Sequence, residues 1–212
     1  MSSDADFDRA VDRVRNFVTR IGDTVAEPIQ DREDGTRTVG FVVERDSYRY
    51  QVLGQPGQEF FHVIFPFSIV SQLEGVMTRE AAIEILADDE DDLDDVAERA
   101  PEDPRHNAAL RVLNGVAPGE REAFAYYLVI ILGSGDAAFV LQNTDTGMVA
   151  GFQVFTKVFP YEREFSLTEF NRSVQSVVNT GISAMLFVNF TFDLPSMVDN
   201  GGVTGMPPWY IH

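Results

Sequence analysis

The stretch from Ser166 to Val188 limits the possible folds of this chain more than any other. Its apolar residues recur at steps of three, four and seven, the spacing of a helix with one broad apolar face; they are Leu167, Phe170, Val174, Val177, Val178, Met185 and Leu186. Ser166 and Glu169 match the S-x-x-E capping box that pairs two amide groups at a helix start. Because two apolar, strand-like runs precede it, this helix is predicted to lie across a sheet and close the core.

The N-terminal part of the sequence predicts one helix and three strands. Apolar residues between Phe7 and Ile21 share one helical face, and Gly22 stands where a helix C-cap belongs. Runs rich in Val, Phe and Tyr follow, separated at hairpin distance: Thr36 to Arg45, Tyr48 to Leu53 and Phe60 to Phe65. These runs predict three antiparallel strands.

The middle of the sequence is predicted to be helical and acidic. Pro66 is expected to end the third strand, and Ser68 to Leu73 to form a short helical turn. Thr78 is expected to cap a further helix, and Asn107 to Leu113 to form another. Between them lies a run of carboxylates, Asp88 to Asp95, which is typical of a solvated face.

The following segment predicts a second set of strands. Pro118-Gly119 is expected to end the helical middle. Three strand candidates come next: Phe124 to Leu132, Ala138 to Gln142 and Met148 to Phe159. The turn Gly133-Ser134-Gly135-Asp136 is expected to join the first two as a tight hairpin.

Together these elements predict an α+β fold. An antiparallel β-sheet is flanked by an N-terminal amphipathic helix and a long C-terminal helix, with a helical, acidic insertion. We expect a single domain over residues 5–192, the insertion at residues 76–118, and a tail rich in glycine, proline and aromatic residues at 193–212.

The charge of the chain is strongly acidic. It has 34 acidic and 16 basic residues, a formal net charge of -18, and a single lysine, Lys157. Carboxylates hold water and ions where high ionic strength screens their repulsion, so this pattern favours a halophilic protein over an acidic protein of an ordinary cytosol. Nucleic-acid binding is disfavoured, because phosphate neutralisation needs clustered Lys and Arg.

Further sequence features predict a cytoplasmic protein that does not insert into a membrane. Met1 to Asp8 lacks the basic segment and apolar core of a secretory signal. No apolar run approaches the roughly 20 residues of a membrane helix. The sequence has no cysteine, which excludes disulfides, thiolate metal sites and a cysteine nucleophile.

The residues that could carry chemistry form no recognisable site. His62, His106 and His212 lie in no metal-ligand spacing, and Asp88 to Asp95 lacks the glycine and terminal Glu of a calcium loop. No G-x-S-x-G motif is present, and no Lys-Ser/Thr follows the glycines near Ser134. We therefore expect no catalytic residue, no metal and no cofactor, hence no enzyme.

The order of elements, with the capped final helix after Tyr161 to Ser166, resembles the type III secretion chaperone-like fold shared with YbjN-type proteins. The resemblance covers about Phe7 to Val188, and the acidity suggests a haloarchaeal-type member. This chain adds the helical and acidic middle, Thr78 to Gly115, and the tail. The resemblance implies a non-enzymatic protein that pairs with itself through one sheet or helix face and holds an extended partner segment on another.

Two functions are therefore expected. The first is a protein-binding or chaperone-like module adapted to high salt; the alternative is a structural or accessory subunit of a larger assembly. A protein partner or self-association is expected in either case, as a homodimer or an assembly subunit. A small-molecule enzyme stays open only if a carboxylate such as Asp136 or Asp145 is essential.

The tail contains the residues that we expect to bind a partner. They are Met206, Trp209, Tyr210 and Ile211, which follow a glycine-containing lead and the pair Pro207-Pro208. Aromatic groups left in water would promote association, so they are expected to dock. Two sites stay open: the sheet of the same chain, or a neighbouring subunit, for which Trp and Tyr are common anchors.

Overall fold

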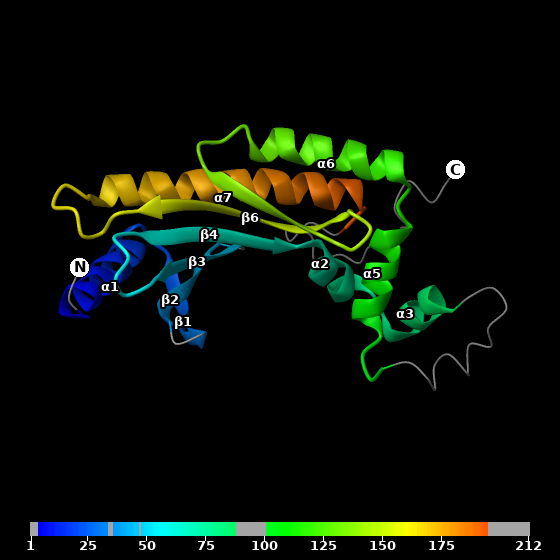
Figure 1. Cartoon of the computed structure of the whole chain (residues 1–212), viewed down its shortest axis with the longest axis horizontal. Helices are drawn as coiled ribbons and strands as arrows, with labels where there is room; N and C mark the ends of the chain where they lie inside the picture. Colours follow the sequence, from blue (N-terminus) through cyan, green and yellow to red (C-terminus); the bar gives the residue numbers. More distant parts are fainter. Residues whose placement is uncertain (1–3, 34–35, 47, 88–100, 195–212) are drawn as a thin grey trace. The chain divides into compact units, whose positions relative to one another are not determined.

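The computed structural model contains a six-stranded sheet with the strand order β1-β2-β3-β4-β6-β5. The strands are drawn as arrows in Figure 1. Successive pairs from β1 to β4 are antiparallel. The structure describes residues 4–33, 36–46, 48–87 and 101–194. The strands are β1 (Thr24–Glu33), β2 (Thr36–Arg45), β3 (Tyr48–Gly54), β4 (Phe61–Ser68), β5 (Ala138–Asn143) and β6 (Val149–Val158).

The helices of the described residues lie at both ends of the sequence and in its middle. They are α1 (Asp4–Arg20), α2 (Ile69–Val76), α3 (Arg79–Leu86), α5 (Arg105–Gly115), α6 (Pro118–Leu132) and α7 (Leu167–Thr191). The antiparallel sheet, the N-terminal helix and the long C-terminal helix confirm the predicted α+β fold class. None of the helices that the structure describes is long and apolar enough to cross a membrane.

The chain divides into two units, each assembled from three stretches of sequence. The first contains residues 1–66, 131–139 and 153–183, and the second contains residues 67–130, 140–152 and 184–212. The expectation of a single domain over residues 5–192 stays a prediction.

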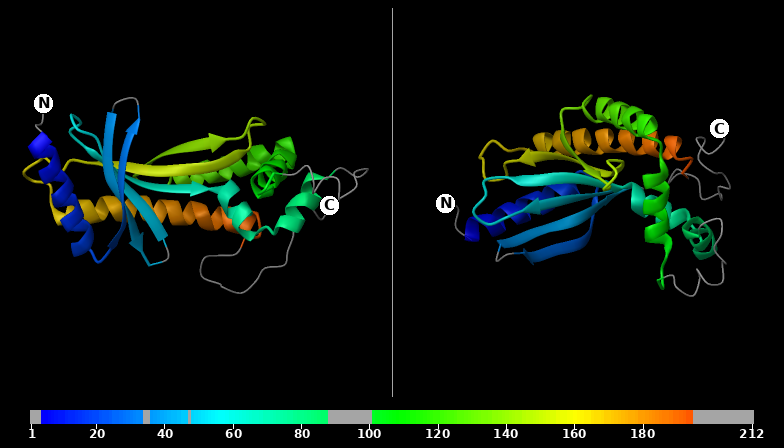
Figure 2. Two further views of the ribbon diagram at one scale, coloured as in Figure 1. Left: turned by 90° about the horizontal axis from the view of Figure 1, so that it is seen from below. Right: turned by 45° about the vertical axis from the view of Figure 1, so that its right-hand side comes forward.

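In the first unit, α1 lies against strands β1 and β2 (Figure 2). Its apolar face is buried, as the sequence predicts, and Phe7 stacks on Phe61 of β4 with 5.7 Å between ring centroids. Phe17 contacts the rings of Phe165 and Phe170. Gly22 follows the helix with a φ of +91°, a conformation that glycine adopts without steric cost, which confirms it as the C-cap residue.

A buried polar cluster connects β1's start to β2 and β3. Asp23 is 7% exposed and accepts hydrogen bonds from Tyr50 Oη at 2.6 Å and from Arg45 Nε at 2.7 Å. Burial, and the hydrogen bond to this carboxylate, raise the pKa of the Tyr50 phenol. The cluster satisfies a carboxylate that would otherwise be costly to bury.

The first half of α7 belongs to the same unit and begins with the predicted capping box. The Ser166 backbone N–H donates to Glu169 Oε2 at 2.8 Å, and the Glu169 N–H donates to Ser166 Oγ at 3.3 Å. Phe170 and Val177 are fully buried, as expected from their place on the apolar face. Further along, Gly181 lets the helix approach β4 closely, because an added Cβ would lie 2.4 Å from the Phe65 ring.

The first strands differ from the sequence analysis at two points. β1 was not predicted, because its sequence mixes Pro28 with charged residues; it is half of a hairpin whose partner, β2, carries the apolar alternation. Pro66 does not end β4, which continues to Ser68. The pairing of β4 with β3 stops at Ile64, so the missing N–H of Pro66 removes no hydrogen bond to β3.

In the second unit, two short helices begin at side-chain caps, of which the sequence analysis predicted the one at Thr78. Ser68 Oγ accepts from the Ser71 N–H at 3.1 Å before α2, and Thr78 Oγ1 accepts from the Ala81 N–H at 3.2 Å before α3. The expected helix at Asn107 to Leu113 is confirmed as part of α5. The carboxylate run Asp88 to Asp95 lies outside the described residues.

The largest correction concerns residues Phe124 to Leu132, which form helix α6 and not a strand. Pro118 is the first residue of this helix, so it begins a helix where the sequence analysis expected one to end. Gly133 to Asp136 consequently connects a helix to β5, and no hairpin forms there. Leu186 is a smaller correction: it was assigned to the buried face of α7, yet it is 47% exposed.

Candidate functional site

Helix α6 is apolar on all its sides from Ala123 to Leu132. One side is buried and contains Phe124, Leu128 and Leu132, spaced by four residues. The helix lies alongside the C-terminal part of α7 (Figure 1), where the Phe124 ring stacks on that of Phe187 at 5.5 Å. A surface helix normally carries charged residues on its outer side, and α6 carries none from Ala123 to Leu132.

The outer side of α6 exposes large apolar residues to solvent. We name Tyr126, Val129 and Ile130 the α6 face; they are 64%, 41% and 50% exposed. Their spacing of three and four residues places them together on the helix surface. The described part of the chain has nine exposed large hydrophobic residues, and eight of them belong to the second unit: Val76, Tyr126, Tyr127, Val129, Ile130, Val140, Leu186 and Phe190.

The start of α6 is held in place by one arginine. Arg121 donates to the backbone carbonyls of Asn114 at 2.7 Å and Thr146 at 2.8 Å, and also to that of Val116. These carbonyls come from α5, from the turn before α6 and from the β5–β6 loop. The α6 face is therefore presented on a fixed helix.

A cavity of about 270 Å³ opens beside α6 in the second unit. Its walls are almost entirely apolar and include four aromatic rings. The lining residues are Val116, Glu120, Ala123, Phe124, Tyr127, Met148, Phe187, Thr191 and Phe192. The rings of Phe124 and Phe192, both in the cavity wall, meet edge to face with 5.4 Å between their centroids.

Two residues give the cavity hydrogen-bond acceptors. Thr191 donates its hydroxyl to the Phe187 carbonyl at 2.7 Å, which leaves the lone pairs of Oγ1 as acceptors. Glu120 contributes a carboxylate, whose Oε2 accepts a hydrogen bond from the backbone N–H of Ala117 at 3.4 Å. An aromatic group that carries an N–H or O–H donor matches this combination of apolar walls and polar rim.

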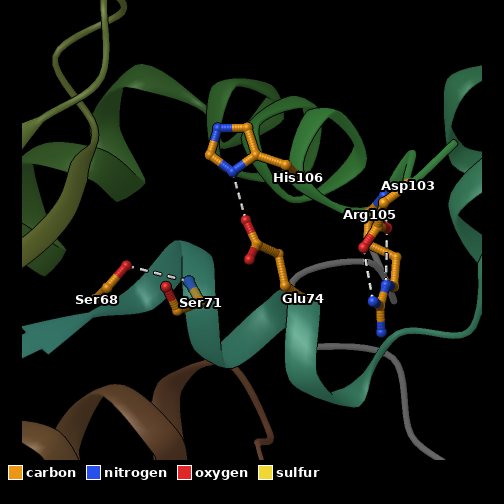
Figure 3. A network of polar contacts seen from close by, with 6 residues as sticks. All are labelled: Ser68, Ser71, Glu74, Asp103, Arg105 and His106. Carbon is orange, nitrogen blue, oxygen red and sulfur yellow. Dashed lines mark hydrogen bonds and ion pairs between the residues drawn. The ribbon is translucent and has the colours of Figure 1, made fainter. Parts of the chain in front are cut away.

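The histidines occupy separate places in the described chain. His62 on β4 contacts the rings of Phe60 and Phe155, and its burial, with nearby Lys157, lowers the pKa of the imidazole. His106 on α5 contacts the Glu74 carboxylate of α2 (Figure 3). No group of three or more His, Asp or Glu residues close enough to hold a metal occurs among residues that the structure describes.

Figure 3 also shows an ion pair at the start of α5. Both guanidinium nitrogens of Arg105 that face Asp103 donate to its carboxylate, at 2.8 and 2.6 Å. These hydrogen bonds lower the pKa of the Asp103 carboxyl to about 2. The pair lies at the start of α5. Because both side chains are exposed to solvent, it contributes little to stability.

The residues that were expected to bind a partner belong to the C-terminal part of the sequence. Met206, Trp209, Tyr210 and Ile211 lie outside the described residues. The carboxylates Asp136 and Asp145 are both exposed.

The α6 face and the cavity were not foreseen from the sequence. Residues 123–135 contain no charge, although 24% of the chain is charged, and this was the available signal. The sequence analysis instead predicts a strand at Phe124 to Leu132, because an apolar run without periodicity has the same appearance in a strand and in a helix exposed on one side.

Comparisons with known proteins concern the fold. No protein-family model and no curated protein matches this chain. Among solved structures, the chain is similar to the crystal structure of an uncharacterized protein from Methanothermobacter thermautotrophicus, with a TM-score of 0.53 and 10% sequence identity. The match covers 85% of this chain and 96% of that chain. At this identity the similarity shows a shared fold alone.

Proposed function

We propose that the chain is a non-enzymatic protein-binding module that works in concentrated salt and pairs with a second copy of itself through the α6 face. The observation that supports this most directly is the exposure of Tyr126, Val129 and Ile130 on the uncharged part of helix α6. Exposed apolar groups of this size are typical of protein interfaces, in which tyrosine is a frequent anchor.

Charge favours a second copy as the occupant. The chain carries a formal net charge of -18, so most surfaces of two copies would repel each other. Residues 123–135 contain no carboxylate, so the α6 face itself brings no charge into the interface when it packs on a second copy. The same surface on both copies gives a two-fold symmetric interface. The resemblance to the type III secretion chaperone-like fold agrees with such pairing.

Salt strengthens this interface in the proposed setting. At 1 M salt the Debye length is about 3 Å, so the remaining carboxylates of two copies repel each other only at close range. Burial of apolar side chains is not screened and supplies the attraction. The proposal places the protein in a cytoplasm of high ionic strength.

Light scattering after size exclusion in multimolar potassium chloride tests the proposal. We expect a dimer for the wild type and a monomer for the double variant Tyr126→Gln, Ile130→Gln, because glutamine keeps helix propensity and removes the apolar contact. The matched control is Val76→Gln, an exposed apolar residue at the end of α2, which should stay dimeric.

Other results would overturn the pairing. A monomeric wild type would exclude the second copy as the occupant of the α6 face. A particle larger than a dimer that persists in the double variant would instead favour an assembly subunit. Dimers in both the wild type and the double variant would place the interface elsewhere.

A further inference from the structure

The cavity beside α6 has the size and lining of a site for one large aromatic side chain. Its volume of about 270 Å³ is below the roughly 300–1,000 Å³ of small-molecule pockets. Rings of Phe124, Tyr127, Phe187 and Phe192 surround it and allow edge-to-face contact with another ring. Thr191 and Glu120 supply acceptors for one polar hydrogen at its rim.

The sequence contains one segment with this chemistry. Residues 206–211 read Met-Pro-Pro-Trp-Tyr-Ile and include Trp209, the single tryptophan of the chain. Tryptophan combines a large apolar ring, which suits the aromatic walls, with an N–H donor, for which Thr191 and Glu120 offer acceptors. The two prolines before it restrict the backbone, and proline-containing segments bind aromatic-lined grooves with a small loss of entropy.

The connection between the cavity and this segment is short enough to favour the same chain. Phe192 is a wall of the cavity, and Leu194 is the last residue that the structure describes. Residues 195–205 then separate Leu194 from Met206 and span up to about 36 Å when extended. Helix α6 is only about 22 Å long, so the segment can reach any part of the cavity. Tethering also gives an effective concentration on the order of millimolar.

We propose that the cavity beside α6 is a binding site for an aromatic side chain and that Trp209 of the same chain occupies it. The indole ring packs against Phe124, Phe187 and Phe192, and its Nε1–H donates to Thr191 or Glu120. This inference concerns a different surface from the α6 face and does not depend on pairing of two copies.

Tryptophan fluorescence tests occupancy in the full chain. The wild type should show blue-shifted emission and protection from acrylamide. Ala123→Leu places a larger side chain in the cavity, so emission should shift to the red and quenching should rise several-fold. Ala117→Leu introduces the same side chain at an exposed position outside the lining and should leave emission unchanged.

Crosslinking identifies which chain supplies the tryptophan. Because the sequence contains no cysteine, the pair Ala123→Cys, Tyr210→Cys introduces the only two thiols. Oxidation should give a crosslink within one chain, seen as a faster-migrating monomer on a denaturing gel. The control pair Ala117→Cys, Tyr210→Cys should react far less, because a disulfide needs Cα atoms within about 7 Å.

Three results would overturn the inference. The first is a tryptophan quenched as freely in the wild type as in Ala123→Leu. The second is protection that is equal in Ala123→Leu and Ala117→Leu, which would place the ring elsewhere. The third is a crosslink predominantly between two chains. The double variant Tyr126→Gln, Ile130→Gln separates the two proposals, because it should abolish pairing and leave Trp209 protected.

Discussion

Two buried polar side chains, Asp23 and Asn189, differ in whether their polar atoms are hydrogen-bonded. Asp23 is buried, and both its carboxylate oxygens are paired, with Tyr50 and Arg45. Asn189 on α7 is 4% exposed, and neither its amide nitrogen nor its amide oxygen has a hydrogen-bond partner within the described part of the chain. An unpaired buried amide costs free energy, whereas a paired carboxylate is tolerated.

Replacing Asn189 with leucine should therefore stabilise the protein. Leucine has a similar shape and no polar atoms, so the variant removes a desolvation cost of about 1–3 kcal/mol. Chemical denaturation of the wild type and Asn189→Leu measures the difference. Asn179→Leu, on the exposed side of the same helix, is the control and should change stability by less than about 0.5 kcal/mol. A destabilised Asn189→Leu would contradict this expectation.

At the scale of elements, helices α6 and α7 differ in how much of their apolar surface is buried. The first half of α7 buries a continuous row against the sheet, from Phe170 through Val174 and Val177. Helix α6 buries only one side and leaves Tyr126 and Ile130 in solvent. Substitutions on the two helices should therefore act differently, on folding in α7 and on association in α6.

The side of α7 that is buried can be tested by its effect on stability. Phe170→Ala should lower the free energy of unfolding by about 3–5 kcal/mol, because the ring is fully buried and its removal leaves a cavity. Arg172→Ala, two residues along on the exposed side, should change it by less than about 0.5 kcal/mol. Urea denaturation measures both, and equal losses would contradict the observed orientation of the helix.

Sequence reasoning found the elements that have strong local signals. The capping box at Ser166, the C-cap at Gly22 and the cap at Thr78 all mark real helix ends. It failed at α6, where Pro118 was interpreted as a stop. Proline is equally suited to the first position of a helix, because that N–H has no partner within the helix.

The site could not be assembled from the sequence for a different reason. The cavity brings together Val116, Phe124, Met148 and Phe187, and no local pattern relates positions so far apart in the chain. The exposure of Tyr126 could not be predicted either, because an apolar run does not show which side of the helix packs against the rest of the protein.

At the scale of the whole molecule, charge is the dominant property. The 34 acidic residues outnumber the 16 basic ones, and exposed carboxylates occur in both units, for example at Asp8 and Glu84. Unbalanced charge of one sign destabilises the folded state through self-repulsion, and salt screens that repulsion.

The melting temperature should therefore rise with potassium chloride. The Debye length falls from about 10 Å at 0.1 M to about 3 Å at 1 M, so most of the rise should occur below molar salt. Thermal unfolding followed by circular dichroism measures it. Neutralising four exposed carboxylates, Asp8, Glu84, Glu122 and Asp136, to the corresponding amides should reduce the slope. A flat or falling melting temperature in the wild type would contradict adaptation to salt.

The contacts of Arg13 in α1 affect how the chain folds while it is being translated. Its guanidinium donates to the carbonyls of Pro160 at 2.8 Å and Glu162 at 2.9 Å, and also to that of Phe165. The first two acceptors lie 147 and 149 residues later in the chain. At about 5–20 residues per second, α1 waits about 7 to 30 s for them. Throughout that interval Phe17 lacks its later neighbours Phe165 and Phe170, so the nascent chain exposes this side of α1 until the segment that contains these two rings has been made.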